Sequence, residues 1–143
     1  MEQYIEFASS HWMLVTAFLA VTYFLIHDII ETSLRKYKSI SPMLTVTRLN
    51  SANPIILDVR DAGEYKKGHL ADAIHIPLTS LDSSMKKIEL YKSDEVIVTC
   101  QTGMRSTSAC DKLIKAGFTN VFNMTGGMQS WEENKLPVVT GKK

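Results

Sequence analysis

The chain has 143 residues, 45% of them hydrophobic and 22% charged, which is the composition of a globular protein with room for one ordinary domain. The formal net charge of +1, without a basic stripe that interleaves aromatic residues, argues against nucleic acid as a partner. The two cysteines are too few for a disulfide framework, and no CxxC or ligand-spaced His/Cys cluster occurs, so we expect a reducing compartment and no metal.

Residues 12–26 form an apolar run, WMLVTAFLAVTYFLI, that contains no charge. As a helix this run rises about 22 Å, against a hydrocarbon core of about 30 Å, so a membrane span must include neighbouring residues. A signal peptide is the first alternative, but residues 1–11 carry Glu2 and Glu6 and no Lys or Arg. A buried core helix is the second alternative, and it would show a recurring polar face. We predict an N-terminal tail at 1–10 and a transmembrane helix at 11–30.

The charges on either side of this run predict an orientation. Residues 1–11 hold no Lys or Arg, whereas Arg35, Lys36 and Lys38 follow the run closely. The positive-inside rule therefore places the C-terminal part in the cytoplasm. We expect a short tether at 31–39 and one domain at 40–143.

In this domain, strands and helices alternate along the chain. Residues 54–59 and 95–99 are short, β-branched and apolar on both faces, which indicates buried strands. Between them, Asp61 and Glu64 form a capping-box pattern that opens one helix, and a second helix is expected over residues 81–91.

The same alternation continues to the end of the domain. Residues 106–116 form an amphipathic helical pattern that Gly117 ends, and residues 120–123 are expected to form another strand. Gly126 and Gly127 then turn the chain into a last helix, whose Trp131 is expected to lie in the core. The predicted fold is α/β, with a mostly parallel sheet that helices cover on both faces.

The segment VIVTCQTGMRS carries the chemistry, because a buried strand delivers Cys100 into a short loop that leads into a helix. Inward N–H groups of such a loop and the positive end of the helix stabilise an anion, and Gly103 permits the tight curvature. Arg105 adds a fixed cation, and the combined field lowers the pKa of a thiol. We therefore expect Cys100 to be a thiolate at neutral pH. Cys110 lies on the apolar face of the following helix, and we interpret it as core.

Three motifs together resemble the rhodanese family over almost all of the soluble part, roughly residues 40–137. ILDVRDAGEYKKGHLADAIHIP at 56–77 resembles its first signature, CQTGMRS at 100–106 its active-site loop, and GGMQSW at 126–131 its closing motif. An N-terminal anchor before one such domain is similar to the small membrane-bound rhodaneses of bacteria, which implies the inner membrane.

The resemblance implies a sulfurtransferase without a metal or organic cofactor, in which Cys100 carries sulfane sulfur as a persulfide. The donor is a small sulfur compound such as thiosulfate, and the acceptor is cyanide, a thiol or a protein. By position, the substrate-binding residues are Gln101, Thr102, Gly103, Met104 and Arg105, with Arg105 recognising an anionic donor.

Several nearby residues have structural interpretations instead. We expect Asp58 to cap a turn, Arg60 to pair with Glu64, and His69 to fix a loop.

Two other functions use a similar fold. Cysteine phosphatases and arsenate reductases resemble this loop but place Arg six positions after Cys, whereas Arg105 is five positions after Cys100. A shorter loop has less space for a tetrahedral oxyanion. A membrane-tethered binding module without turnover is the other alternative, although such a module would be expected to lose the cysteine.

Overall fold

The computed structural model describes residues 11–33 and 36–141, which belong to two compact units. The predicted N-terminal tail at 1–10 and residues 34 and 35 of the predicted tether lie outside the described residues. Each unit is described separately below.

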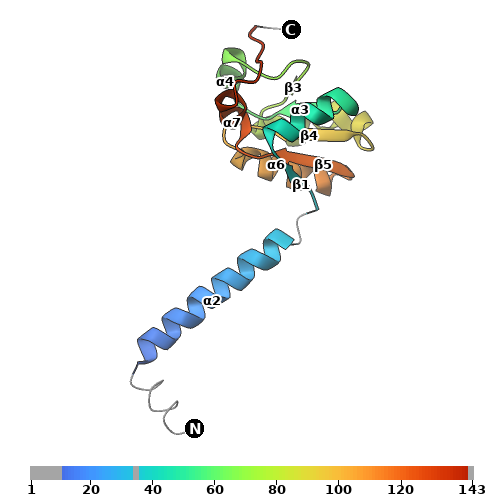
Figure 1. Ribbon diagram of the computed structural model, residues 1–143. Helices are drawn as coiled ribbons and strands as arrows, with labels where there is room; N and C mark the ends of the chain where they lie inside the picture. Colours follow the sequence, from blue (N-terminus) through green and yellow to red (C-terminus); the bar gives the residue numbers. More distant parts are fainter. Residues whose placement is uncertain (1–10, 34–35, 142–143) are drawn as a thin grey trace. The chain divides into compact units, whose positions relative to one another are not determined.

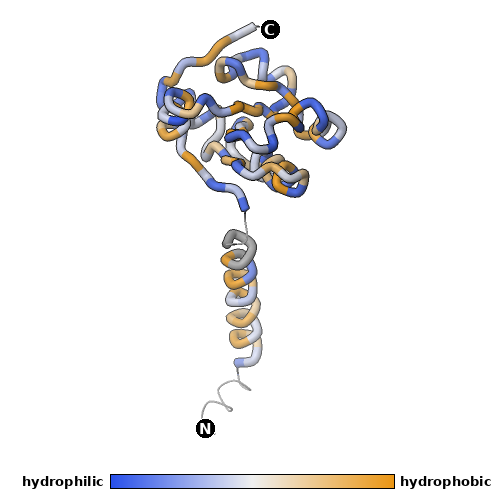
Figure 2. Tube along the Cα trace, turned by 90° about the vertical axis from the view of Figure 1, so that its right-hand side faces the viewer, coloured by the Kyte–Doolittle hydropathy of each residue, from blue (hydrophilic) through white to orange (hydrophobic). Residues whose placement is uncertain are grey.

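The described part of the first unit forms the helix α2 (Trp12–Ser33). Apolar side chains such as Phe18, Phe24 and Ile29 are 65–70% exposed, and Figure 2 shows hydrophobic residues along much of the helix. Within the described residues, however, no helix is long and apolar enough to cross a membrane. The uncharged run ends at His27 and Asp28 after about 22 Å of helix, which is short of a bilayer core. The predicted transmembrane helix at 11–30 is therefore not supported.

The second unit contains an entirely parallel sheet, as the alternating pattern predicted (Figure 1). Among residues 36–141 its strand order is β1-β5-β4-β2-β3. The strands are β1 (Lys38–Ile40), β2 (Ile55–Asp58), β3 (Ile74–His75), β4 (Glu95–Thr99) and β5 (Asn120–Met124). β2, β4 and β5 agree with the predicted strands within one residue at each end. β1 was not predicted and lies mostly within the segment expected to be a tether, and β3 was not predicted either.

Helices connect these strands. They are α3 (Pro42–Ser51), α4 (Ala62–Lys67), α5 (Leu81–Ile88), α6 (Met104–Lys115) and α7 (Gly127–Glu133), with short 3₁₀ turns η1 (Leu78–Ser80) and η2 (Glu89–Tyr91). The predicted capping box opens α4, where the backbone N–H of Asp61 donates to Glu64 Oε2 at 3.2 Å. The helix expected at 81–91 is α5 followed by η2, and α3 was not predicted.

The central strands β2 and β4 bury side chains on both faces, which is why their middle residues are apolar. Leu57 and Val98 belong to one core cluster, together with residues of α5 and α6. Ile56 and Ile97 belong to another, together with residues of α3 and α7, among them Trp131. Consecutive strand residues point to opposite faces, so the helices cover the sheet on both sides.

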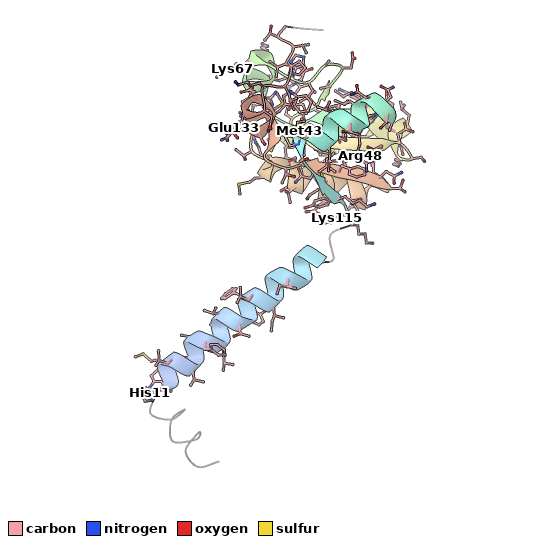
Figure 3. All side chains as sticks on the ribbon, in the orientation of Figure 1. His11, Met43, Arg48, Lys67, Lys115 and Glu133 are labelled. Atoms are coloured by element: carbon pink, nitrogen blue, oxygen red, sulfur yellow. The ribbon has the colours of Figure 1, made fainter. Side chains whose placement is uncertain are left out.

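A polar contact also holds helix α3 against the sheet. On one face, Arg48 of α3, labelled in Figure 3, donates to Glu95 Oε2 at 2.7 Å, and its guanidinium carbon lies 4.4 Å from the ring centroid of Phe122. Such a cation over an aromatic face adds attraction to that of the ion pair. The contact joins α3 to the beginning of β4 and to β5.

A buried ion pair lies at the end of β2. Arg60 Nη2 donates to Asp58 Oδ2 at 2.8 Å, and the two side chains are only 2% and 0% exposed. Arg60 also donates to the Gly68 carbonyl at 2.6 Å and to Gln101 Oε1 at 3.1 Å. The pair therefore ties β2 to the segment after α4 and to the loop after β4.

This pair generates a prediction for stability. Asp58→Ala leaves the Arg60 charge buried without its carboxylate, and we expect the free energy of unfolding to fall by about 3–5 kcal/mol. Asp82→Ala removes an exposed partner of Lys112 and should cost less than about 1 kcal/mol. Urea unfolding followed by circular dichroism measures both variants. Equal losses in the two variants would contradict the importance of the buried pair.

Candidate active site at the end of strand β4

The loop between β4 and α6 is built around a sharp change of direction. Cys100 directly follows β4, and α6 begins at Met104. Gly103 precedes this helix with φ at 93°, in the left-handed region that side chains disfavour. A Cβ added to Gly103 would also lie 3.1 Å from the backbone nitrogen of Gly126. Glycine is therefore required at this position for two separate reasons.

Cys100 is buried, and its sulfur accepts hydrogen bonds from the loop. The backbone N–H of Gly103 donates to Cys100 Sγ at 3.1 Å, and Ser106 Oγ lies 3.5 Å from the same sulfur. Burial raises the pKa of the Cys100 thiol, but hydrogen bonds from Ser106, Thr102 and Gly103 outweigh burial, and the pKa is lowered overall. The direction agrees with the thiolate expected from the sequence.

Polar groups of Asn123 and Gly103 hold the side chain of Ser106 beside the sulfur. Ser106 Oγ lies 2.6 Å from Asn123 Oδ1 and 3.0 Å from the Gly103 carbonyl oxygen. The Gly103 carbonyl also accepts from Thr107 Oγ1 at 3.0 Å and from Asn123 Nδ2 at 3.4 Å. These bonds join the loop, the first turn of α6 and β5, so the loop backbone that faces Cys100 is held from three sides.

Helix α7 supports the loop on its outer side. The backbone N–H groups of Met128 and Gln129 donate to the carbonyls of Cys100 and Gln101 at 2.8 and 3.0 Å. A Cβ on Gly127 would lie 2.3 Å from the Cys100 carbonyl oxygen. The approach is therefore possible only for glycine, which explains one of the two adjacent glycines of the closing motif. The peptide unit whose Gln101 carbonyl is bound to α7 carries the N–H of Thr102, which is one of the backbone groups that lower the Cys100 pKa.

Arg105 is bound to carboxylates of the α4 region. Arg105 Nη2 donates to Glu64 Oε1 at 2.7 Å, and Nη1 donates to Asp61 Oδ2 at 3.3 Å. The hydrogen bond from Arg105 lowers the pKa of Glu64, and the bond to Glu64 raises the pKa of Arg105. The expected pairing of Arg60 with Glu64 is wrong, because Arg60 points into the interior towards Asp58 while Arg105 reaches Glu64 across the loop.

The other predicted site residues lie in different surroundings. Gln101 Oε1 accepts from Arg60, whereas Thr102 and Met104 are exposed. The role of residues 101–105 in binding a substrate stays a prediction. His69 Nδ1 lies 2.9 Å from the Tyr65 carbonyl oxygen, and its ring stacks on Tyr65 with centroids 3.7 Å apart. These contacts agree with the interpretation that His69 fixes a loop.

Cys110 differs from Cys100 in its environment. It is fully buried on α6 within the core cluster that covers one face of the sheet. Burial raises the pKa of the Cys110 thiol far above its usual range. Cys110 is thus a core residue, as its place on the apolar helix face indicated.

The rhodanese-like domain model matches residues 44–134, which is more than half of the chain and includes the loop. This chain belongs to the rhodanese-like domain family. The match covers the sheet from β2 to β5 and the helices that position the loop.

Several other proteins are similar to this chain at different levels. YibN of Escherichia coli strain K12, an uncharacterized protein, is 27% identical over 99% of this chain and 100% of its own length. The thiosulfate sulfurtransferase GlpE of Coxiella burnetii is 31% identical over 67% of this chain and 88% of its own length. A crystal structure of a rhodanese-related protein from Thermoplasma volcanium has a TM-score of 0.66 and 32% identity, and the match covers 73% of this chain and 100% of that chain.

Three residues of this rhodanese-like site were missed by sequence reasoning. Ser106 was recognised only as the beginning of a helix. In the structure its hydroxyl lies 3.5 Å from the Cys100 sulfur. Glu64 was assigned to a capping box and not to Arg105. Asn123 carries no sequence signal, because only the pairing of β5 with β4 brings it beside the loop.

The contact between Ser106 and Cys100 generates a prediction. Ser106→Ala removes a hydroxyl that lies 3.5 Å from Cys100 Sγ and lowers the Cys100 pKa, so the midpoint of thiol reactivity should move to higher pH. The rate of Cys100 alkylation by iodoacetamide across pH measures this midpoint. Ser108→Ala, an exposed serine on the same helix, is the control and should leave the profile unchanged. Identical profiles for both variants would reject the role of Ser106.

Proposed function

We propose that this rhodanese-like domain is a sulfurtransferase in which Cys100 carries sulfane sulfur as a persulfide. The observation that carries the proposal is the Cys100 sulfur, which accepts the Gly103 N–H at 3.1 Å in a loop that lowers the thiol pKa. The relationship to a thiosulfate sulfurtransferase supports the same chemistry. A thiolate is the reactive form of cysteine, and it requires no adjacent histidine when the loop itself stabilises it.

The reaction proceeds in two displacements. The Cys100 thiolate attacks the sulfane sulfur of the donor, a new S–S bond forms, and the donor remnant leaves with the electrons of the broken bond, as sulfite does from thiosulfate. A thiol or cyanide then attacks the outer sulfur, and Cys100 leaves as a thiolate. The loop N–H groups hold the negative charge of the sulfur in both steps, which is electrostatic stabilisation by donors already in place.

The donor must reach a sulfur that has no exposed surface. Neighbouring groups therefore have to move before the thiolate meets its substrate. Met104, the first residue of α6 and part of the segment that follows Cys100, is 78% exposed. The described features require no cofactor for either displacement, and the proposed acceptor is a thiol, cyanide or a protein cysteine.

Cys100→Ser should abolish thiocyanate formation from thiosulfate and cyanide, because the hydroxyl cannot hold sulfane sulfur. Cys110→Ser should keep most of the activity, since Cys110 is a buried core residue. Mass spectrometry after thiosulfate treatment should find one added sulfur atom on the peptide that contains Cys100. Similar losses in both variants would contradict the assignment of Cys100 as the sulfur carrier. A wild-type protein that neither gains sulfur nor forms thiocyanate is a binding module.

We also propose that α2 holds the domain at the cytoplasmic face of a bacterial cell membrane. The support is the set of exposed apolar side chains on α2 and the charge asymmetry of the sequence. Because the described helix does not meet the requirements of a span, the proposal concerns attachment and orientation.

The membrane proposal predicts that the full chain sediments with membranes after cell lysis. Phe18→Lys combined with Phe24→Lys should release it into the soluble fraction, since both side chains are exposed on α2 and two charges oppose burial in lipid. A C-terminal alkaline phosphatase fusion should be inactive, because that reporter requires an oxidising exterior. A soluble wild-type chain would overturn attachment, and an active fusion would overturn the orientation.

A further inference from the structure

The guanidinium expected to bind an anionic donor is already occupied by carboxylates. Arg105 contacts Glu64 at 2.7 Å and Asp61 at 3.3 Å, and its side chain is 35% exposed. An incoming dianion has to compete with both carboxylates for Arg105. It also meets their charges, because Asp61 is 74% exposed and Glu64 is 31% exposed.

Among the described residues, the charged groups that contact the loop or Arg105 have a net negative charge. Arg60 is balanced by Asp58, to which it is bound in the interior. Arg105 is balanced by one of its two carboxylates, so the other remains uncompensated. The Cys100 thiolate, which interacts electrostatically with Arg105, adds a second negative charge. The lysines at the end of α4, Lys66 and Lys67, are exposed and screened by solvent ions, whereas Asp61 and Glu64 contact Arg105 directly.

We propose that Asp61 and Glu64 make this site select sulfane-sulfur donors that carry at most one negative charge over dianions such as thiosulfate. The proposal rests on the sulfurtransferase function and names its substrate class. Organic thiosulfonates and protonated persulfides belong to this class. In each case the Cys100 thiolate attacks the sulfane sulfur, the new S–S bond forms, and the sulfinate or thiolate leaves with the electrons of the broken bond.

Glu64→Gln tests the charge without removing the side chain. Glutamine has one acceptor oxygen where Glu64 uses two, so it can keep the capping-box bond from the backbone of Asp61 while it loses the charged acceptor for Arg105. Glu89→Gln is the control, because it makes the same change in an ion pair with Lys92. Glu89 lies in η2, before the beginning of β4, whereas Cys100 follows the end of β4.

The first measurement is independent of sulfur transfer. Iodoacetate and iodoacetamide alkylate the same Cys100 thiolate and differ by one negative charge, so the ratio of their rate constants reports the local field and cancels any change in thiol pKa. We expect Glu64→Gln to raise the ratio of iodoacetate to iodoacetamide by about two- to fivefold at low salt. Glu89→Gln should leave the ratio unchanged. An unchanged ratio in Glu64→Gln overturns the proposal.

The second measurement compares two donors of similar size. Methanethiosulfonate carries one negative charge and thiosulfate carries two, and both yield thiocyanate with cyanide. In the wild type we expect the larger kcat/KM for methanethiosulfonate, and Glu64→Gln should narrow the gap by lowering KM for thiosulfate. A wild type that prefers thiosulfate contradicts the proposal. If the alkylation ratio shifts but neither donor reacts, the charge selectivity stands and the sulfurtransferase function fails. A Cys100 that reacts with neither reagent nor donor overturns both.

Discussion

Two hydrogen bonds from the beginning of α7 to the carbonyls of Cys100 and Gln101 decide how the loop is oriented. A peptide unit that binds a donor through its carbonyl on one side can present the neighbouring N–H groups on the other side. Gly127 makes this possible, because any Cβ there would overlap the Cys100 carbonyl. Helix α7 therefore supports the loop around the Cys100 sulfur through backbone hydrogen bonds, and the closing motif contributes to this loop as well as to the core.

The larger part of the fold was predictable because its strands are buried on two faces. β2 and β4 are covered by different helices on each side, so the run of residues in the middle of each strand is apolar and stands out in the sequence. β1 and β3 have three and two residues and lie at the edges of the sheet, where so short a pattern cannot be distinguished from a loop. For α3 a signal was present, since Ser41 caps it and Pro42 is its first residue.

The site was predictable only where its parts are close together in sequence. Cys100, Gly103 and Arg105 belong to one loop, so their spacing indicated the chemistry directly. The pairing of the arginines was not predictable in this way. Arg60 and Glu64 have the spacing of a helical ion pair, but the backbone at Arg60 precedes α4 and turns the side chain inward. Glu64 therefore pairs with Arg105 and not with Arg60, because burial and chain direction, which depend on the whole sheet, place the two arginines differently.

If Cys100 carries sulfur as proposed, the contrast between the two cysteines determines how long that sulfur remains bound. Enzymes that form disulfides release a sulfur species by attack of a second, resolving thiolate of the same chain. Cys110 is the second of the two cysteines in the sequence, and its burial keeps it as an unreactive thiol. A persulfide on Cys100 consequently has no internal route of discharge as a Cys100–Cys110 disulfide. In the proposed reaction its lifetime is set by the arrival of an external acceptor, and the domain would hold one sulfur atom between encounters.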